Sequence, residues 1–382
     1  MKTIIINGEI LTPSELIKGS RLIIEDGLIS CIEEDKSDLF GNSTVIDADG
    51  MYICPGLIDI HFHGALGKDT MDSQSDAIRT FADFCVKHGV TSFYPTTWSA
   101  SQNQIHDSIM TVKGCMKYEE GAQILGVHLE GPYINLNYRG AQSADSIRVP
   151  NKSEYSRWFE SDVVKLITCA PEVDRGFEFI KDAINNRVKI SIGHSHSSYM
   201  DVIHAADLGA NQATHIFNGM PSIHHRDPGI VVGVLNDDRI FTQIICDGIH
   251  LHPAIVLLIA RVKTPSRSIL ITDSIRGTGL SDGQYDNNGQ VMLINNGVAR
   301  TVDGVLSGST LTLEQAIKNM IRFTNYPLTD ILQMATKTPA LAMGIANKKG
   351  VIQKGADADL VFFDNDFIVQ KTFIRGILKY SK

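Results

Sequence analysis

The middle of the chain alternates between short apolar runs and stretches with helical periodicity. One helical stretch has apolar residues at Ile78, Phe81, Ala82 and Cys85. Buried parallel strands read as near-continuous apolar runs, and their alternation with helices is typical of parallel α/β folds. A count of eight runs favours a closed (β/α)8 barrel over an open doubly wound sheet. The runs are residues 57–60, 91–94, 124–129, 163–169, 188–192, 212–215, 241–246 and 268–271.

Both ends of the chain consist of short β-like runs separated by turn residues. Near the N-terminus the runs are 3–6, 21–25 and 28–33, and Asn7-Gly8 and Asp26-Gly27 follow two of them, which is a strong hairpin signal. Residues 359–363 and 367–378 form the same pattern of short β-like runs at the C-terminus. Each piece is too small to bury a face alone, so we expect the two to build one small β-sandwich domain. The predicted division is 1–53 and 345–382 for the sandwich and 54–344 for the barrel.

The composition is that of an ordinary globular protein. Hydrophobic residues make up 43% of the 382 and charged residues 20%, with a formal net charge of −8. This balance excludes a disordered or fibrous chain and argues against nucleic acid as the main partner, which would favour a basic face. The six cysteines include no C-x-x-C pair, and no apolar stretch approaches the ~20 residues of a membrane span. We therefore expect a soluble, cytoplasmic protein with reduced thiols.

Ionisable residues follow most of the predicted strands. In barrel enzymes the active site forms at this carboxyl end of the strands, so the pattern predicts a catalytic barrel. The segments are His61-Phe62-His63, Glu130-Gly131-Pro132, Ala170-Pro171-Glu172, Gly193-His194-Ser195, His215, Asp247-Gly248-Ile249-His250 and Thr272-Asp273-Ser274.

Glu130, His194 and His215 offer one carboxylate and two imidazoles, the donor set of a three-ligand catalytic zinc site. Each residue alone would be an ordinary loop glutamate or structural histidine, but together they predict a divalent metal with one position left for water. Imidazole and carboxylate also suit iron, so the sequence leaves Zn or Fe open. His61 and His63 lie on the same side of an extended segment. The pair is therefore placed to complete a second metal position, with Glu130 bridging.

Asp273 ends the last apolar run and is the candidate general base, because an aspartate is ionised at neutral pH. Arg226, in a turn-rich loop, is a candidate bidentate phosphate contact, and a surface salt bridge with Asp227 is the alternative. His250 is a candidate second phosphate contact or an ordinary loop histidine. The other histidines are interpreted as structural, His128 with the least support. The sequence has no glycine-rich nucleotide-binding motif, so no nucleotide cofactor is indicated.

These segments resemble the amidohydrolase superfamily and, more narrowly, the N-acetylglucosamine-6-phosphate deacetylases. The matching stretches occur in family order and span nearly the whole chain, and L-E-G-P and H-x-F-N-G-M are far more specific than H-x-H. They are Pro55-Gly56-Leu57-Ile58-Asp59 with His61-Phe62-His63-Gly64, Val127-His128-Leu129-Glu130-Gly131-Pro132, Ala170-Pro171-Glu172, Gly193-His194-Ser195, Thr214-His215-Ile216-Phe217-Asn218-Gly219-Met220, His225-Arg226-Asp227-Pro228-Gly229, Asp247-Gly248-Ile249-His250, Thr272-Asp273 and Leu306-Ser307-Gly308-Ser309.

The resemblance implies a metal-dependent (β/α)8 TIM barrel hydrolase flanked by a β-sandwich from both termini. It would convert N-acetylglucosamine 6-phosphate and water to glucosamine 6-phosphate and acetate in amino-sugar catabolism or wall recycling. Glu130, His194 and His215 match the family's metal ligands, and Asp273 matches its acid/base. In this family part of the phosphate site comes from a neighbouring subunit, which implies a homodimer or dimer-based oligomer. The matching substrate contacts are Ala141, Asn218, Gly219, Arg226, His250, Leu306, Ser307 and Gly308.

Two positions refine this expectation. Some members of the family lack the H-x-H pair and use one metal, so His61 and His63 imply the two-metal version. Gln142 stands where many members have a histidine that assists the substrate carbonyl, and its amide can donate a hydrogen bond to an oxyanion but supplies no charge. We therefore expect metal-bound hydroxide to attack the acetyl carbonyl while Asp273 takes the proton. The metal and Gln142 would hold the oxyanion before Asp273 returns the proton to the amine.

Three alternatives remain open from the sequence. Deacetylation of N-acetylgalactosamine 6-phosphate differs in one hydroxyl epimer only. A cyclic-amide or dipeptide hydrolase would use the same barrel, although such enzymes usually carry a carboxylated lysine where Glu130 stands here. A non-catalytic barrel scaffold would have lost its metal ligands, whereas this sequence retains them.

Overall fold

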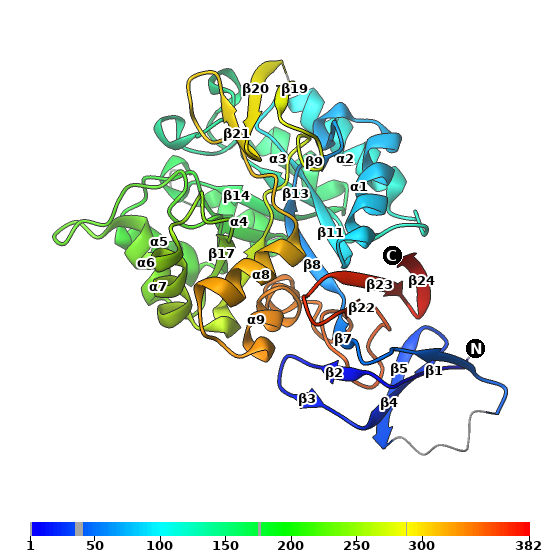
Figure 1. Cartoon of the computed structure of the whole chain (residues 1–382). Coiled ribbons are helices and arrows are strands. Elements are labelled where there is room, and N and C mark those ends of the chain that lie inside the picture. Colours follow the sequence, from blue (N-terminus) through cyan, green and yellow to red (C-terminus); the bar gives the residue numbers. More distant parts are fainter. Residues whose placement is uncertain (1, 35–40, 175–176, 288) are drawn as a thin grey trace.

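The computed structural model describes residues 2–34, 41–174, 177–287 and 289–382. Parallel strands and helices from the middle of the chain form a barrel, and strands from the two termini lie side by side at one end of the molecule (Figure 1). Among the described helices, none is long and apolar enough to cross a bilayer.

Strands from both chain ends share one sheet, with the order β24-β23-β22-β7-β2-β3. Antiparallel pairing of β22 with β7 joins the C-terminal strands to the N-terminal ones. A second sheet, β5-β4-β1-β6, contributes Ile5 and Leu22 to an apolar cluster that also contains Ile53, Phe362 and Phe373. The small β unit predicted from both termini is therefore present, and its exact limits stay a prediction. The strands are β1 (Lys2–Ile6), β2 (Glu9–Leu11), β3 (Leu16–Ile17), β4 (Ser20–Glu25), β5 (Leu28–Glu34), β6 (Thr44–Asp47), β7 (Tyr52–Pro55), β22 (Leu360–Phe363), β23 (Val369–Ile374) and β24 (Ile377–Ser381).

Eight parallel strands form a nearly closed barrel, as the apolar runs predict. The sheet runs in chain order from β8, which pairs with β11, to β18. Between β18 and β8 the pairing is reduced to a bridge between Phe62 and Ser274, and the Thr272 hydroxyl donates to Asp59 Oδ2 over 2.6 Å. The strands are β8 (Leu57–Phe62), β11 (Val90–Thr97), β13 (Val127–Glu130), β14 (Val164–Cys169), β15 (Lys189–Ile192), β16 (Gln212–Ala213), β17 (Phe241–Ile245) and β18 (Ser268–Ile271).

Three predicted runs differ from the structure because turns interrupt them. Residues 124–129 form two strands, β12 (Gln123–Ile124) and β13, since Gly126 lies between them with φ of 145°. Residues 367–378 form the β23–β24 hairpin, with positive φ at Arg375 and Gly376. β16 ends at Ala213, so His215 lies beyond the strand and not within it.

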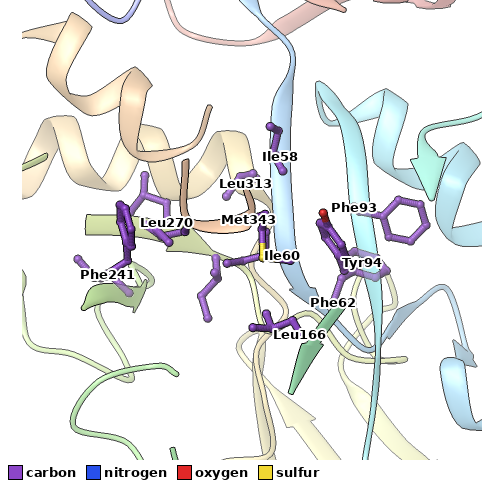
Figure 2. Packing of buried hydrophobic residues seen from close by; sticks show 14 of the residues in the cluster. Ile58, Ile60, Phe62, Phe93, Tyr94, Leu166, Phe241, Leu270, Leu313 and Met343 are labelled. Atoms are coloured by element: carbon purple, nitrogen blue, oxygen red, sulfur yellow. The ribbon is translucent and has the colours of Figure 1, made fainter. Parts of the chain in front are cut away.

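Helices pack around the barrel and bury the outward-facing apolar side chains of the strands. Phe62 lies 5.7 Å from Phe93 and 5.6 Å from Phe81 of α1, between ring centroids. Figure 2 shows part of this core, with Ile58 and Ile60 on β8. The α-helices are α1 (Ser75–Lys87), α2 (Gln102–Cys115), α3 (Lys152–Glu160), α4 (Glu178–Asn185), α5 (Tyr199–Asp207), α6 (Gly229–Asn236), α7 (Pro253–Lys263), α8 (Leu313–Phe323), α9 (Leu328–Met334) and α10 (Lys337–Met343).

A three-stranded antiparallel sheet, absent from the sequence prediction, stands above the barrel (Figure 1). It consists of β19 (Gly283–Asn287), β20 (Gln290–Asn295) and β21 (Val298–Thr301). Its buried apolar residues Met292 and Ile294 cluster with Trp98 and Ile275 and so attach the sheet to the barrel. The hairpin signal Asn296-Gly297 between β20 and β21 could have revealed it.

Candidate active site

Six predicted site residues converge at the carboxyl end of the barrel strands. Glu130 ends β13, and His61 lies on β8 with His63 directly after it. His194, His215 and Asp273 each lie two residues beyond the end of a strand, after β15, β16 and β18. All six side chains are buried. Residues up to 212 positions apart in the sequence are thereby brought together because parallel strands end at one face.

Glu130, His194 and His215 form a first compact group. Glu130 Oε1 lies 3.1 Å from His194 Nε2 and 3.0 Å from His215 Nε2, and the two nitrogens are 3.2 Å apart. Each residue offers one ligand atom, all within 4.8 Å of one another, so one cation could touch all three. The sequence predicted this set from its donor types.

His61, His63 and Asp273 form a second group beside the first. The two Nε2 atoms are 3.1 Å apart, and Asp273 Oδ1 lies 3.3 Å from His61 and 3.2 Å from His63. Glu130 lies between the groups, with Oε1 3.5 Å from His61 Nε2 and Oε2 3.4 Å from His63 Nε2. The same-side placement of the histidines and the intermediate position of Glu130 match the prediction. The membership of Asp273 was missed.

Three of these residues have a left-handed backbone, which non-glycine residues rarely adopt. The φ values are 48° at His194, 25° at His215 and 51° at Asp273. Such strain typically occurs at functional sites, where the surrounding structure enforces it. Here it turns each side chain back over the barrel mouth immediately after its strand.

Burial and mutual charge set the ionisation of the two groups. Burial alone raises the pKa of Asp273, but the neighbouring imidazoles of His61 and His63 outweigh it and hold that pKa below its usual value. Burial also opposes ionisation of Glu130, yet His61 and His194 keep its pKa well below normal. For His63, burial lowers the pKa, but hydrogen bonds to Asp273 and Glu130 raise it to about 10. The site thus holds ionised carboxylates that favour positive charge between them.

The imidazoles fit a metal by their orientation. His194 donates from Nδ1 to the Tyr138 carbonyl over 2.8 Å, which leaves its Nε2 directed at the first group. The Nδ1 atoms of His61, His63 and His215 are buried and have no partner among the described residues. Their Nε2 atoms, like that of His194, point into the groups. The donor set and geometry therefore suit one or two divalent cations.

Gly219 packs against this arrangement at close range. Its φ is 62°, and a Cβ there would lie 2.7 Å from His194 Nδ1 and 2.9 Å from the Tyr138 oxygen. A side chain would therefore break the hydrogen bond that orients His194. This contact explains the glycine independently of any substrate.

Three residues that support the site have no role in the sequence prediction, although Asp59 and Glu172 belong to the matching segments. Asp59 accepts hydrogen bonds from Thr272 and, over 3.2 Å, from the backbone of His61. Trp98 stacks on His63 with ring centroids 4.1 Å apart. Glu172 accepts hydrogen bonds from Ser195 and Ser197 in the loop that follows His194. The alternation of residues 59, 61 and 63 could have revealed Asp59, whereas nothing local indicates Trp98.

A cavity of about 180 Å³ lies over the two groups. Its lining includes seven of the predicted substrate contacts, Ala141, Gln142, Asn218, Gly219, His250, Leu306 and Gly308, together with Glu130, His194, His215 and Asp273. His250 is fixed by Asp247, whose Oδ2 lies 2.6 Å from its Nδ1.

Two predicted contacts do not line this cavity. Ser307 is buried, with its hydroxyl 3.4 Å from Asn287 Nδ2. Arg226 is exposed and donates to His225 Nε2 over 2.7 Å. Its loop, the connection before α6, projects from the barrel (Figure 1). His128 is buried behind the site between Thr96 and Thr168, consistent with a structural role.

Comparison with known proteins agrees with this architecture. The amidohydrolase family model matches residues 52–378. An N-acetylglucosamine-6-phosphate deacetylase from Bacillus subtilis is 35% identical over 378 residues, covering 97% of this chain and 95% of the relative. An N-acetylgalactosamine-6-phosphate deacetylase from Escherichia coli O157:H7 is 32% identical over 372 residues, covering 97% of each chain.

Solved structures give the same result. The N-acetylglucosamine-6-phosphate deacetylase of Pasteurella multocida superposes with a TM-score of 0.95 at 28% identity and 100% coverage of both chains. A Mycobacterium smegmatis N-acetyl-D-glucosamine-6-phosphate deacetylase, solved in complex with N-acetyl-D-glucosamine-6-phosphate, has a TM-score of 0.90 at 28% identity, covering 100% of this chain and 99% of that one. The sequence match, the fold and the metal-binding groups together establish that this chain belongs to the amidohydrolase family.

Proposed function

We propose that this protein is a metal-dependent deacetylase that hydrolyses N-acetylglucosamine 6-phosphate to glucosamine 6-phosphate and acetate. The observation that carries the proposal is the convergence of Glu130, His194 and His215 beside Asp273 under one cavity. Relatives with the same architecture and full-length coverage bear the name of this activity. The scaffold alternative loses its support, because the ligand groups are intact and buried.

Glu130, His194 and His215 would hold one divalent cation, Zn²⁺ or Fe²⁺, and His61, His63 and Asp273 are placed to hold a second. When bound, such a cation lowers the pKa of water and polarises a carbonyl, which makes amide hydrolysis feasible near neutral pH. The chain's own contribution is to fix the ligand atoms before the substrate arrives.

Asp273 moves the proton in this proposal. Water adds to the acetyl carbonyl carbon and loses a proton to the Asp273 carboxylate, which is ionised at neutral pH because His61 and His63 hold its pKa low. The carbon–nitrogen bond then breaks, and Asp273 returns the proton to the amine nitrogen. Its position in the cavity lining, 3.2 Å from His63, is consistent with this role.

The remaining cavity residues would bind and orient the sugar phosphate. Asn218, Gly219 and His250 are available in the lining of the same chain. Arg226 lies outside it on the projecting loop, so we propose that it reaches the phosphate of a substrate bound in a partner subunit of a dimer. We also propose a cytoplasmic enzyme, since its six cysteines are free thiols.

N-acetylgalactosamine 6-phosphate is the second candidate substrate, favoured by the Escherichia coli relative. The test is release of acetate from both sugar phosphates and from unphosphorylated N-acetylglucosamine, compared by kcat/KM. The proposal expects the highest value for N-acetylglucosamine 6-phosphate and a large loss without the phosphate. A higher kcat/KM for N-acetylgalactosamine 6-phosphate would favour the second candidate. If neither sugar phosphate released acetate, both proposals would be refuted.

A further inference from the structure

A second cavity, of about 270 Å³, opens at the end of the barrel opposite the candidate active site. Lys165 and Lys189 lie at the beginning of β14 and β15, whereas the metal-binding groups lie at the strand ends. Arg187, Lys348 and Lys349 complete a set of five cationic residues in its lining. We call this the basal cavity. Its location separates it from the deacetylase chemistry.

Two of the five cations are neutralised within the chain. Lys165 pairs with Asp162 at 3.0 Å. Lys349 pairs with Asp357 and Asp359, each at 2.7 Å. These two side chains therefore contribute little net positive charge to the basal cavity.

The other three cations have no carboxylate partner among the described residues. Lys348 donates to the Gly355 carbonyl over 2.9 Å and keeps its full charge. The side chains of Arg187 and Lys189 make no hydrogen bond or close ion pair within the described part of the chain, although Arg187 lies near enough to Asp162 to help lower the pKa of that carboxyl. No aspartate or glutamate belongs to the described lining. Three cations without a close carboxylate partner around one cavity favour an anionic ligand, in a chain whose net charge is −8.

Tyr94 adds a hydrogen-bonding residue to the lining of the basal cavity. Only 2% of the residue is exposed, yet it lines the basal cavity, and its hydroxyl has no partner among the described residues. Figure 2 shows the hydroxyl directed toward the end of the barrel that holds Ile58, away from Phe62. Burial raises the pKa of the phenol, which therefore remains a neutral hydrogen-bond donor. This donor is available to an oxygen atom of a ligand in the basal cavity.

We propose that the basal cavity is a binding site for a small phosphate-bearing metabolite. Arg187, Lys189 and Lys348 bind the phosphate, because guanidinium and ammonium groups make strong charge-assisted hydrogen bonds to phosphate oxygens. The hydroxyl of Tyr94 donates to an oxygen of the same ligand deeper in the cavity. The volume is near the lower end for small-molecule sites, which fits a compact ligand.

Titration calorimetry with inorganic phosphate on the full chain tests this proposal. Arg187→Ala/Lys189→Ala should lose about tenfold or more in affinity at one class of site, because two charged hydrogen-bonding groups are removed. Lys117→Ala/Arg261→Ala, which removes two exposed cations elsewhere, is the control of equal charge and should bind as the unmodified protein does. Tyr94→Phe preserves charge and shape and should weaken binding by about two- to tenfold.

Identical isotherms for the unmodified protein, Arg187→Ala/Lys189→Ala and Tyr94→Phe would overturn the proposal. An equal loss of phosphate affinity in the Lys117→Ala/Arg261→Ala control would also overturn the proposal. The loss would then follow from the lower positive charge of the whole protein and not from the basal cavity. Thermal unfolding of each variant verifies that the fold is retained. Since the readout is binding and not acetate release, the result does not depend on the proposed deacetylase function.

Discussion

The side-chain amide of Gln142 donates a hydrogen bond to Glu130 Oε2 over 2.5 Å, while Glu130 Oε1 faces His194 and His215. Gln142 is itself fixed, since its Oε1 accepts from the Ser99 backbone N–H over 2.6 Å. Gln142 therefore orients the carboxylate between the two metal-binding groups. Its amide has a second N–H, so the predicted contact with the substrate oxyanion stays a prediction.

Substitution Gln142→Ala should weaken metal retention by about 10- to 100-fold, the usual effect of removing a group that orients a metal ligand. Competition with a chelator, followed by elemental analysis, measures this. Gln284→Ala, at an exposed glutamine of β19, is the control. Equal metal retention in the unmodified protein and Gln142→Ala would contradict the positioning role.

Asp273→Asn should lower kcat by about 10²- to 10⁴-fold, because the amide cannot accept the proton from water. Metal should remain bound by Glu130, His194 and His215, which the substitution leaves intact. Steady-state acetate release and metal content of the same sample are the measurements. Asp303→Asn, at an exposed aspartate, is the control. Near-normal turnover with metal bound would remove Asp273 from the mechanism.

Glu172→Gln should destabilise the loop that carries His194. Glu172 Oε2 accepts from the hydroxyls of Ser195 and Ser197, each over 2.7 Å, and Oε1 accepts from Asn135 Nδ2 over 2.9 Å. An amide replaces one acceptor with a donor, which should cost about 1–3 kcal/mol of unfolding free energy. Urea unfolding and metal affinity should both decline. An unchanged unfolding midpoint would show that the loop does not need this carboxylate.

Lys263 should make stability depend on pH in the alkaline range. It is buried and donates to the carbonyls of Val234 and Asp237, and burial lowers its pKa to about 8 from the ordinary 10.5. Between these values the unfolded chain binds the proton and the folded chain does not, so the free energy of unfolding rises with pH.

Relative to Lys263→Met, the unmodified protein should therefore gain about 2 kcal/mol of unfolding free energy between pH 8 and pH 10. Urea unfolding of both proteins at the two pH values measures the difference. Lys117→Met, at an exposed lysine, should show no such dependence. A difference that does not change with pH would contradict the shifted pKa of Lys263.

The barrel and the first metal-binding group could be predicted because both depend on local sequence signals. Each barrel strand is so deeply buried that its sequence is a run of apolar residues. The metal-binding residues of the first group directly follow these runs. The prediction of the second metal-binding group was incomplete, because Asp273 comes close to His61 only when β18 lies against β8 in the folded barrel. Trp98 was missed for the same reason, as its stacking on His63 is a tertiary contact. The β19–β21 sheet was missed although β20 contains the apolar run Val291-Met292-Leu293-Ile294, because neither β19 nor β21 has such a run.

The most direct test of the central claim is acetate release from N-acetylglucosamine 6-phosphate by protein stripped of metal with a chelator, repeated after Zn²⁺ or Fe²⁺ is returned. We predict loss of activity on removal and recovery on return, and no recovery in Glu130→Gln. Undiminished acetate release from protein that elemental analysis finds free of metal would contradict the account.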